Sequence, residues 1–251
     1  MIDDLAGATT AIVDVGVTGL WSGPNAPRSV DAPLTADAPD HDRWLHTLDA
    51  APEREDSRYG LFGRYESELL RGEPVLVAEH GPDGWSKVIC PWQPSHKDST
   101  GYPGYVRTAH LRETGDAPAE VPSATGAPTR AALLAQARRH IGLAYLWGGI
   151  SPAGLDCSGL VHYACRSIGL RVPRDAGDQY RSCEDLPIDA AEPGDLYFFA
   201  YPDKPIHHVG IATGGGRLLH APSTGQLVVE EDMPKARRDT LVAAGRIRAL
   251  R

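Results

Sequence analysis

The stretch "ETGDAPAEVPSATGAPT" at residues 113–129 limits what this chain can fold into more than any other segment. It is rich in Pro, Ala, Gly and Thr and has no apolar periodicity, so it cannot present a hydrophobic face to a core. The patterns on its two sides differ in kind. We therefore predict a linker at residues 115–128, between an N-terminal region at 1–114 and a C-terminal domain at 129–251.

The N-terminal region shows short strand-like runs broken by turn signals. The run "AIVDVGVTGLW" alternates, and "GEPVLVAEHGPDGWSKVIC" is typical of a hairpin with "GPDGW" at its turn. Many short strands with Gly and Pro turns favour small all-β barrels. The pattern leaves open whether there is one barrel or two, with a split near residue 50 in the second case.

The C-terminal domain begins with helical patterns and continues with strand-like ones. Thr129 is a candidate N-cap for a helix ending at Gly142, and a second helix starts at "LDCSGL" and ends at Gly169. The apolar stripe of the first helix is Leu133, Leu134, Ala137 and Ile141. The runs "DLYFFAY", "HHVGIATG" and "RLLHAPS" follow as strands. Helices followed by antiparallel strands indicate an α+β domain.

The charge pattern argues against nucleic acid as a partner. The formal net charge is −8, whereas phosphate binding needs clustered Lys and Arg. The small basic group "KARR", Lys235–Arg238, is expected to be an ordinary solvated patch.

The sequence also favours a protein without a membrane span. No run approaches the ~18 consecutive apolar residues that a spanning helix requires. The start, "MIDDLAGATTAIVDVGVTGL", carries aspartates where a secretory signal would be basic, and it lacks an uninterrupted apolar segment. We therefore expect a cytoplasmic protein, with secretion as the alternative if a leader has been removed.

The cysteine in "LDCSGL", Cys157, is the first candidate for chemistry. Asp156 lies at a plausible N-cap and Cys157 in the first helical turn, where unpaired N–H groups and the helix dipole favour a thiolate. On this observation alone, a buried core cysteine is equally plausible. The four cysteines contain no CxxC pair, so we expect no structural zinc site.

Histidines in the strands supply candidates for a base. A thiolate nucleophile needs a base within hydrogen-bond reach, and the base needs an orienting partner. His207 and His208 lie at a strand start and face opposite sides, so only one can face Cys157. His220 on the next strand could lie beside His208. Two histidines could instead bind a metal, but a third ligand of suitable spacing is missing.

Six motifs in register resemble those of the NlpC-type cysteine peptidases, papain-like enzymes that cut peptidoglycan peptides. They are "YLWGG", "DCSGL", "VPRDAGDQ", "EPGDLYFF", "HHVGIATG" and "LLHAPS", which together span most of residues 129–234. The resemblance implies that Cys157 is the nucleophile, His208 the general base and His220 its orienting residue. It also implies that Tyr145 assists the oxyanion hole, and it leaves His207 as a bystander.

The N-terminal half extends the resemblance. The runs "ESELLRGEPVLVAEHGPDGWSKV" and "GYPGYV" resemble bacterial Src-homology-3-like modules, which in one branch of the family wall off the active site. That branch comprises γ-D-glutamyl-L-diamino acid endopeptidases, which act on muropeptides with a free N-terminal L-alanine. Asp175 lies where that branch places a carboxylate that pairs with the substrate amine.

The same resemblance implies further substrate contacts. Asp156 and Ser158 would help to hold the amine and nearby polar groups, and a tyrosine of the N-terminal region would complete the pocket. Tyr65 in "FGRYESELL" is favoured, and Tyr59 is the alternative.

The sequence therefore predicts a cysteine peptidase of small muropeptides that releases L-Ala-γ-D-Glu and needs no metal or organic cofactor. Three alternatives are a wall-binding protein that has lost catalysis, a thiol amidase or acyltransferase of the same fold, and a secreted hydrolase of polymeric peptidoglycan. The intact set of Cys157, His208 and His220 argues against the first.

Overall fold

The computed structural model describes residues 8–81, 83–115 and 127–250 and divides them into two compact units. One unit holds residues 8–115 together with Leu146–Ala153, and the other holds residues 127–145 and the chain from Gly154 onward. Most of the predicted linker, 116–126, lies outside the described residues. Residues 146–153, which the sequence pattern assigns to the C-terminal domain, group with the first unit.

The first unit is built on one seven-stranded antiparallel sheet with the order β3-β2-β6-β5-β4-β1-β7. The expected hairpin is present as β4 paired with β5, and Leu76 lies opposite Ile89. Strands from before and after residue 50 pair within this single sheet. Its strands are β1 (Thr9–Val13), β2 (Val17–Trp21), β3 (Tyr65–Leu70), β4 (Pro74–His80), β5 (Trp85–Cys90), β6 (Tyr102–Arg107) and β7 (Leu111–Glu113).

The first unit also contains helices between β2 and β3 that the sequence analysis missed. Helix α2 is capped by Asp40, whose carboxylate accepts from the Arg43 N–H, and it buries Trp44, Leu45 and Leu48 at helical spacing. These side chains pack in a second core beside the sheet. The elements are η1 (Ser29–Asp31), α1 (Ala32–Thr35), α2 (His41–Ala50) and η2 (Arg58–Leu61), with η3 (Thr108–His110) and β8 (Ile150–Ser151) elsewhere in the unit.

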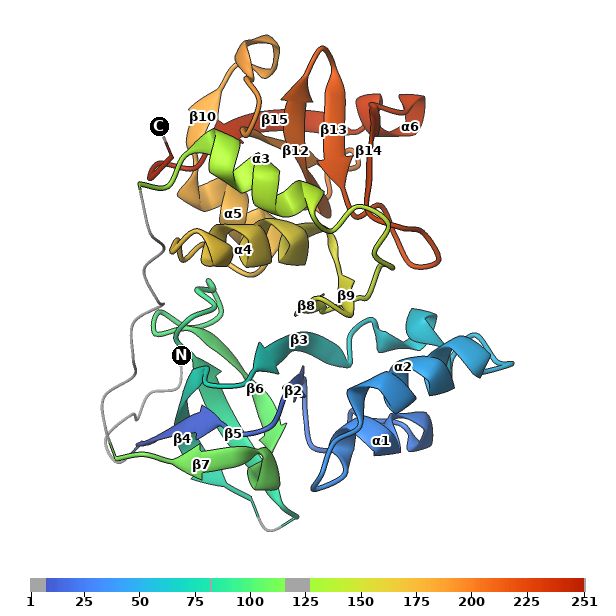
Figure 1. Ribbon diagram of the computed structural model, residues 1–251, viewed down its shortest axis with the longest axis vertical. Helices are drawn as coiled ribbons and strands as arrows, with labels where there is room; N and C mark the ends of the chain where they lie inside the picture. Colours follow the sequence, from blue (N-terminus) through green and yellow to red (C-terminus); the bar gives the residue numbers. More distant parts are fainter. Residues whose placement is uncertain (1–7, 82, 116–126, 251) are drawn as a thin grey trace. The chain divides into compact units, whose positions relative to one another are not determined.

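The second unit is a six-stranded antiparallel sheet with the order β10-β15-β11-β12-β13-β14 (Figure 1). Helix α4 packs against α3, α5 and β12. The helices are α3 (Arg130–Arg138), α4 (Cys157–Ser167), α5 (Ala176–Ser182), η4 (Ile188–Ala190) and α6 (Lys235–Arg238). The strands are β9 (Gly154–Leu155), β10 (Glu184–Leu186), β11 (Leu196–Phe199), β12 (His208–Gly214), β13 (Arg217–His220), β14 (Val229–Asp232) and β15 (Leu241–Arg246).

Helix α3 forms as predicted at its start but ends earlier. Thr129 caps it, because its hydroxyl accepts from the Ala132 N–H at 3.1 Å. The helix ends at Arg138, so Ile141 is no part of the buried stripe and is 48% exposed. The prediction that Ile141 belongs to the apolar face was therefore wrong.

The hairpin of β12 and β13 depends on glycine. Gly215 and Gly216 connect the strands with φ angles of 61° and 77°, a left-handed conformation that glycine adopts without steric cost. This short connection fixes how β13 lies beside β12. The predicted α+β class, with antiparallel sheets in both units, is confirmed.

Candidate active site

Asp156 organises the first turn of α4. One carboxylate oxygen accepts from the Gly159 N–H at 2.7 Å, which caps the helix, and from the Ser158 hydroxyl at 3.2 Å. The cap places Cys157 at the first helical position, as the sequence predicted. The thiol therefore lies among the N–H groups at the positive end of the helix.

The strongest interaction at this helix start involves a residue that the sequence analysis missed. Arg174 makes a two-pronged ion pair with Asp156: Nη1 donates to one carboxylate oxygen at 3.0 Å, and Nη2 to the other at 2.6 Å. Nη1 also donates to the Ser158 hydroxyl at 3.0 Å. The side chains of Arg174 and Asp156 are only 1% and 8% exposed. Such a bidentate pair is among the strong hydrogen-bonded geometries.

This pair changes the expected role of Asp156 and Ser158. Both carboxylate oxygens of Asp156 accept hydrogen bonds within the unit, and its charge is compensated by Arg174. In this structure, Asp156 therefore stabilises the N-terminus of α4. Its predicted contact with a substrate amine, and that of Ser158, stay predictions.

Burial decides the protonation state of Cys157. Loss of hydration raises the pKa of its thiol to about 12, and the Asp156 carboxylate adds to the increase. N–H groups of Val209 and Ser158, and the Arg174 charge, lower the pKa by less. At neutral pH the thiol is therefore protonated at rest, in contrast to the resting thiolate that the helix start alone suggests.

The thiol lies near the first residues of β12. The pKa of Cys157 is affected by the N–H of Val209, the residue that follows His208. Among the described residues, no hydrogen bond joins this thiol to the His208 ring. The close contact between nucleophile and base therefore stays a prediction.

Three polar side chains form a diagonal line across β12, β13 and β14. His208 Nε2 and His220 Nδ1 are 2.8 Å apart, and His220 Nε2 is 3.1 Å from a carboxylate oxygen of Glu231. The register sets up this line: Ile211 pairs with Leu219, so the next position, Gly210, faces His220. A Cβ on Gly210 would come within 3.2 Å of His220 Cβ, so the glycine leaves room for the two rings to meet.

This chain of contacts determines which nitrogens carry protons. A carboxylate can only accept, so His220 Nε2 donates to Glu231. A neutral His220 then has Nδ1 as its acceptor, and His208 Nε2 donates to it. The remaining nitrogen of His208, Nδ1, is consequently the one able to accept a proton. Glu231 was not singled out from the sequence, because its place beside His220 depends on the register of β14.

His207 and His208 face opposite ways, as strand geometry requires. His207 is exposed and stacks on Tyr201 with ring centroids 4.5 Å apart, whereas His208 is buried. Burial lowers the pKa of His208 well below its usual value, and the charges of Arg237, His220 and His207 lower it further. The imidazole is therefore neutral at neutral pH, the state that a general base requires.

Tyr145 is buried in the same unit. Its backbone N–H donates to the Gln226 carbonyl at 2.9 Å. The backbone of Tyr145 also forms an isolated parallel β-bridge with Leu155, which lies just before α4. Burial raises the pKa of its phenol well above the usual value, and the nearby Cys157 and Asp156 charges raise it further. The hydroxyl therefore keeps its proton and is able to donate, as the predicted oxyanion role requires.

Asp175 lies at the N-cap position of α5 but does not cap that helix with its side chain. It is half-buried and follows Arg174 directly, so it comes from the segment that holds Asp156. The predicted carboxylate is thus on the same unit as Cys157. Its contact with a substrate amine stays a prediction.

The two candidate tyrosines belong to the first unit. Tyr65 is 1% exposed, and its ring packs edge-on against Trp21 at 4.9 Å and at a tilt against Trp44 at 5.2 Å. Tyr59 is 43% exposed with the Arg54 guanidinium over its ring. Tyr65 is thus a core residue of its unit, and a substrate contact for either tyrosine stays a prediction.

The basic group at Lys235–Arg238 is not uniformly a solvated patch. Lys235 and Arg238 are exposed, as expected, but Arg237 is half-buried and its charge lowers the pKa of His208. The expectation was therefore wrong for Arg237, because the short helix α6 turns this one side chain inward. Charge content alone cannot show which member of a basic run points inward.

Comparison with known proteins identifies the family. A family model described as the NlpC/P60 family matches residues 142–246. The gamma-D-glutamyl-L-lysine dipeptidyl-peptidase of Bacillus subtilis (strain 168) is 31% identical over 272 residues, which cover 84% of this chain and 90% of that protein. The chain belongs to the NlpC/P60 family. The predicted resemblance to NlpC-type cysteine peptidases and the cysteine peptidase class are thereby confirmed, whereas the Src-homology-3-like modules of the N-terminal region stay a prediction.

Other NlpC/P60 proteins extend the comparison. The gamma-D-glutamyl-L-lysine dipeptidyl-peptidase of Bacillus cereus (strain ATCC 10987 / NRS 248) is 26% identical over a match that covers 84% of this chain and 83% of that protein. The crystal structure of an NlpC/P60 family protein from Bacillus cereus ATCC 10987 superposes with a TM-score of 0.84, at 22% identity, over 95% of this chain and 99% of that one. The probable endopeptidase p60 of Listeria innocua is 44% identical over only 38% of this chain and 20% of its own length.

The pKa of His208 predicts the pH dependence of this NlpC/P60 enzyme. A general base works only when neutral, and burial with the Arg237, His220 and His207 charges lowers the pKa of His208 below its usual value of 6.5. We expect kcat/KM to stay high as the pH falls to 6.5 and to decline only below it. The measurement is a pH–rate profile with a free tripeptide substrate; an acid limb centred at or above 6.5 would contradict it.

Proposed function

We propose that this enzyme hydrolyses the γ-D-glutamyl–L-diamino acid bond of peptidoglycan stem peptides that carry a free N-terminal L-alanine, and that it releases L-Ala-γ-D-Glu. The observation that carries the proposal is the extent of similarity. The relative named a gamma-D-glutamyl-L-lysine dipeptidyl-peptidase is matched over 90% of its length, including the region before the catalytic domain. The match to the p60 endopeptidase covers 38% of this chain.

The charges at the start of α4 and α5 fit the recognition of an amine. An ammonium group that enters a pocket loses hydration, which costs several kcal/mol unless a carboxylate meets it. The charge of Asp156 is compensated by Arg174, so this carboxylate is not the one we assign to the substrate. Asp175, which follows Arg174 directly and is half-buried in the same unit as Cys157, is our candidate for the carboxylate that binds the amine.

The proposed mechanism follows from the protonation states. The Cys157 thiol gives its proton to His208 Nδ1 while the sulfur attacks the γ-carbonyl carbon of D-glutamate. The N–H groups at the start of α4 and the Tyr145 hydroxyl donate to the oxyanion that forms. Protonated His208 then gives its proton to the departing amine, and the C–N bond breaks to leave a thioester.

The second half of the cycle regenerates the enzyme. Neutral His208 takes a proton from water, whose oxygen attacks the thioester, and the C–S bond breaks to return the proton to the sulfur of Cys157. His220 and Glu231 hold neutral His208 in the tautomer whose Nδ1 can accept a proton. The pair acts through His208 and does not touch the reacting atoms.

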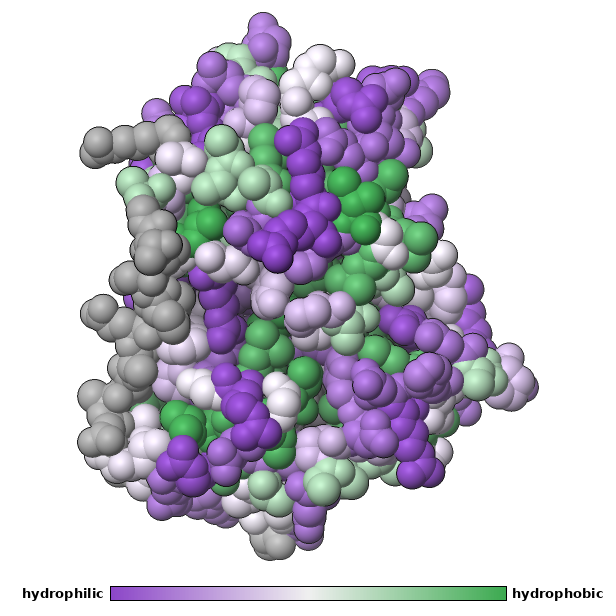
Figure 2. All heavy atoms as spheres, viewed as in Figure 1, coloured by the Kyte–Doolittle hydropathy of each residue, from purple (hydrophilic) through white to green (hydrophobic). Residues whose placement is uncertain are grey.

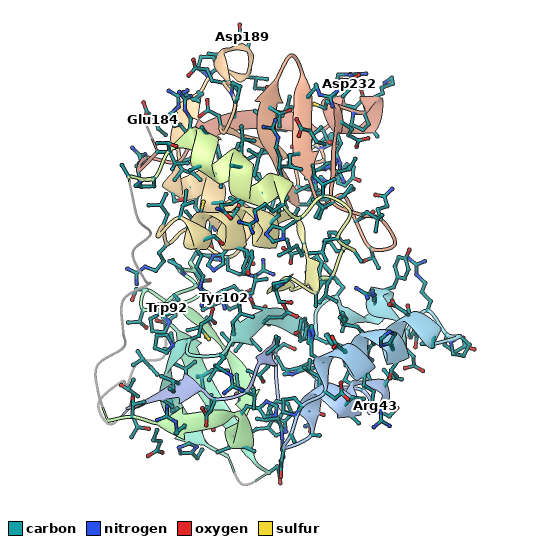
Figure 3. All side chains as sticks on the ribbon, in the orientation of Figure 1. Arg43, Trp92, Tyr102, Glu184, Asp189 and Asp232 are labelled. Carbon is teal, nitrogen blue, oxygen red and sulfur yellow. The ribbon has the colours of Figure 1, made fainter. Side chains whose placement is uncertain are left out.

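Blocking the substrate amine tests the proposal. We expect L-Ala-γ-D-Glu-L-Lys to be cleaved about 100-fold faster than its N-acetyl form, because acetylation removes the charge that a carboxylate would bind. Asp175→Asn should reduce that ratio toward one, whereas Asp189→Asn, at an exposed acid in η4 (Figure 3), should preserve it. Mass spectrometry of the released dipeptide provides the measurement.

Two outcomes would contradict the proposal. Equal rates on the free and the acetylated tripeptide would return the protein to the general class of wall hydrolases. Release of fragments from intact sacculi as fast as from the free tripeptide would favour a hydrolase of polymeric peptidoglycan.

We also propose that the enzyme works in the cytoplasm on fragments of the wall. Within the described residues, no helix is both long and apolar enough to span a membrane. Cell fractionation with detection of the protein in each fraction tests the location.

A further inference from the structure

A pocket of about 740 Å³ lies in the second unit next to the histidine pair. It is bounded by β13, β14 and the segment around α6, and His220 and Glu231 form part of its wall. Figure 2 shows mostly hydrophilic residues where α6 and β14 reach the surface. The polar side chains that line it include those of Tyr201, His220, Gln226, Glu231, Arg237 and Thr240.

Arg237 is the cation of this pocket. Its Nη2 donates to the Pro222 carbonyl at 2.9 Å, and its guanidinium carbon lies 5.8 Å from the centre of the Phe199 ring. The Phe199 ring centre is in turn 5.4 Å from that of His208. These contacts hold the half-buried guanidinium beside the catalytic histidine.

Arg237 has no carboxylate partner among the described residues. Lys235, two residues before Arg237 in α6, pairs with Asp239 at 2.6 Å, and Arg217 on β13 pairs with Asp232 at 2.8 Å. Glu231 shares the pocket with Arg237, but its carboxylate accepts a hydrogen bond from His220 at 3.1 Å. A half-buried cation without an ion pair favours an anionic ligand, because the ligand would compensate its lost hydration.

The Arg237 guanidinium interacts electrostatically with the residues of the candidate active site. Burial lowers the pKa of Arg237, whereas Cys157, Tyr201, Tyr145 and Glu231 favour its charged form. The guanidinium also disfavours protonation of His208. An anion bound at Arg237 would offset that effect at the moment when His208 carries the proton.

The direction of proton transfer determines which part of the substrate lies next to the pocket of Arg237. The departing amine receives its proton from His208, so the leaving group must lie on the imidazole side of the nucleophile. Strands β12, β13 and β14 and helix α6 build that side, whereas Asp156 and Asp175 come from the α4 and α5 side. The diamino acid of a tripeptide carries a free α-carboxylate next to the amine that is released.

We propose that Arg237 binds the free carboxylate of the leaving diamino acid, and that this pocket is the leaving-group subsite. The inference rests on the proposed function and deepens it: the enzyme would prefer stem tripeptides that end at the diamino acid. A longer peptide places its carboxylate at least one residue further from the bond that is cleaved. Arg237 would therefore determine specificity on the side opposite the amine.

A matched pair of substrates tests this inference. L-Ala-γ-D-Glu-L-Lys and its C-terminal amide differ only in the carboxylate, and we expect kcat/KM of the wild type to be about 10- to 100-fold higher for the acid. Arg237→Gln should bring the ratio of acid to amide close to one, and Arg237→Lys should keep part of the preference. Lys235→Gln, which removes an exposed charge from the same helix, should keep the wild-type ratio.

Each outcome decides between explanations. An acid-to-amide ratio near one in the wild type, or a loss of the same factor on both substrates in Arg237→Gln, would overturn the subsite. A wild type that prefers the free amine over the N-acetyl form but ignores the carboxylate would remove this inference and leave the proposed function intact. A wild type that releases no L-Ala-γ-D-Glu would remove both. Thermal unfolding of each variant checks that the fold is retained.

Discussion

Cys157→Ala is expected to abolish peptide hydrolysis, with a loss of about 10⁴-fold or more in kcat, because no other group in the proposed mechanism can form the thioester. The fold should survive. The residue is 8% exposed at the first position of α4, where alanine is a good helix former, so we expect the free energy of unfolding to change by less than about 1 kcal/mol. Rates from product release and unfolding by denaturant provide the two measurements.

Cys165→Ala is the matched control. Cys165 lies eight positions further along the same helix and is fully buried; burial raises the pKa of its thiol, and the nearby Cys183, which is no predicted catalytic residue, raises it further. This variant should lose some stability and keep its activity. Turnover retained in Cys157→Ala, or abolished equally in both variants, would contradict the assignment of the nucleophile.

The predictions from sequence succeeded where the signal was local. Asp156 caps α4 and Thr129 caps α3 because an N-cap needs only a side chain and N–H groups two or three residues on. The alternation of a strand separated His208, which is buried, from the exposed His207. The glycine turn after Gly214 brought β13 beside β12, and with it His220 beside His208.

The residues that were missed depend on contacts between distant segments. Arg174 reaches Asp156 across 18 positions, and nothing in "VPRDAGDQ" shows that the arginine points inward. Glu231 joins His220 only through the register of β14, which follows a loop of eight residues whose path the sequence does not specify. Helix α2 was missed for another reason: Trp44, Leu45 and Leu48 have helical spacing, but the strand-like runs before and after this segment outweighed that signal.

The protonation state of Cys157 is set by opposing effects of different size. The start of α4 stabilises a negative charge by typically 0.3–1 kcal/mol, up to about 2 kcal/mol in partly buried geometries. Burial and the adjacent Asp156 carboxylate oppose it and raise the pKa of the Cys157 thiol to about 12. Because the pKa of the Cys157 thiol is raised and the pKa of His208 is lowered, both side chains are neutral in the resting protein. In the proposed mechanism, the thiol proton therefore moves to His208 only when the sulfur attacks a substrate.

Arg174→Met is expected to lower the free energy of unfolding by about 3–5 kcal/mol, the usual cost of removing one partner from a buried ion pair. The change leaves the buried Asp156 carboxylate, whose side chain is 8% exposed, without its bidentate partner. It also removes a donor from the Ser158 hydroxyl. Unfolding by denaturant, followed by circular dichroism, measures the loss.

Two further variants identify the cause of that loss. Arg217→Met breaks the ion pair of Arg217 with Asp232, whose side chains are 45% and 84% exposed. Asp232 is on the edge strand β14 (Figure 3). We expect this variant to lower the free energy of unfolding by less than about 1 kcal/mol. Adding Asp156→Asn to Arg174→Met removes the uncompensated charge and should recover part of the stability, because the amide oxygen still accepts from the Gly159 N–H. A loss in Arg174→Met no larger than in Arg217→Met would mean that the pair does not hold the start of α4, and the position of Cys157 would need another explanation.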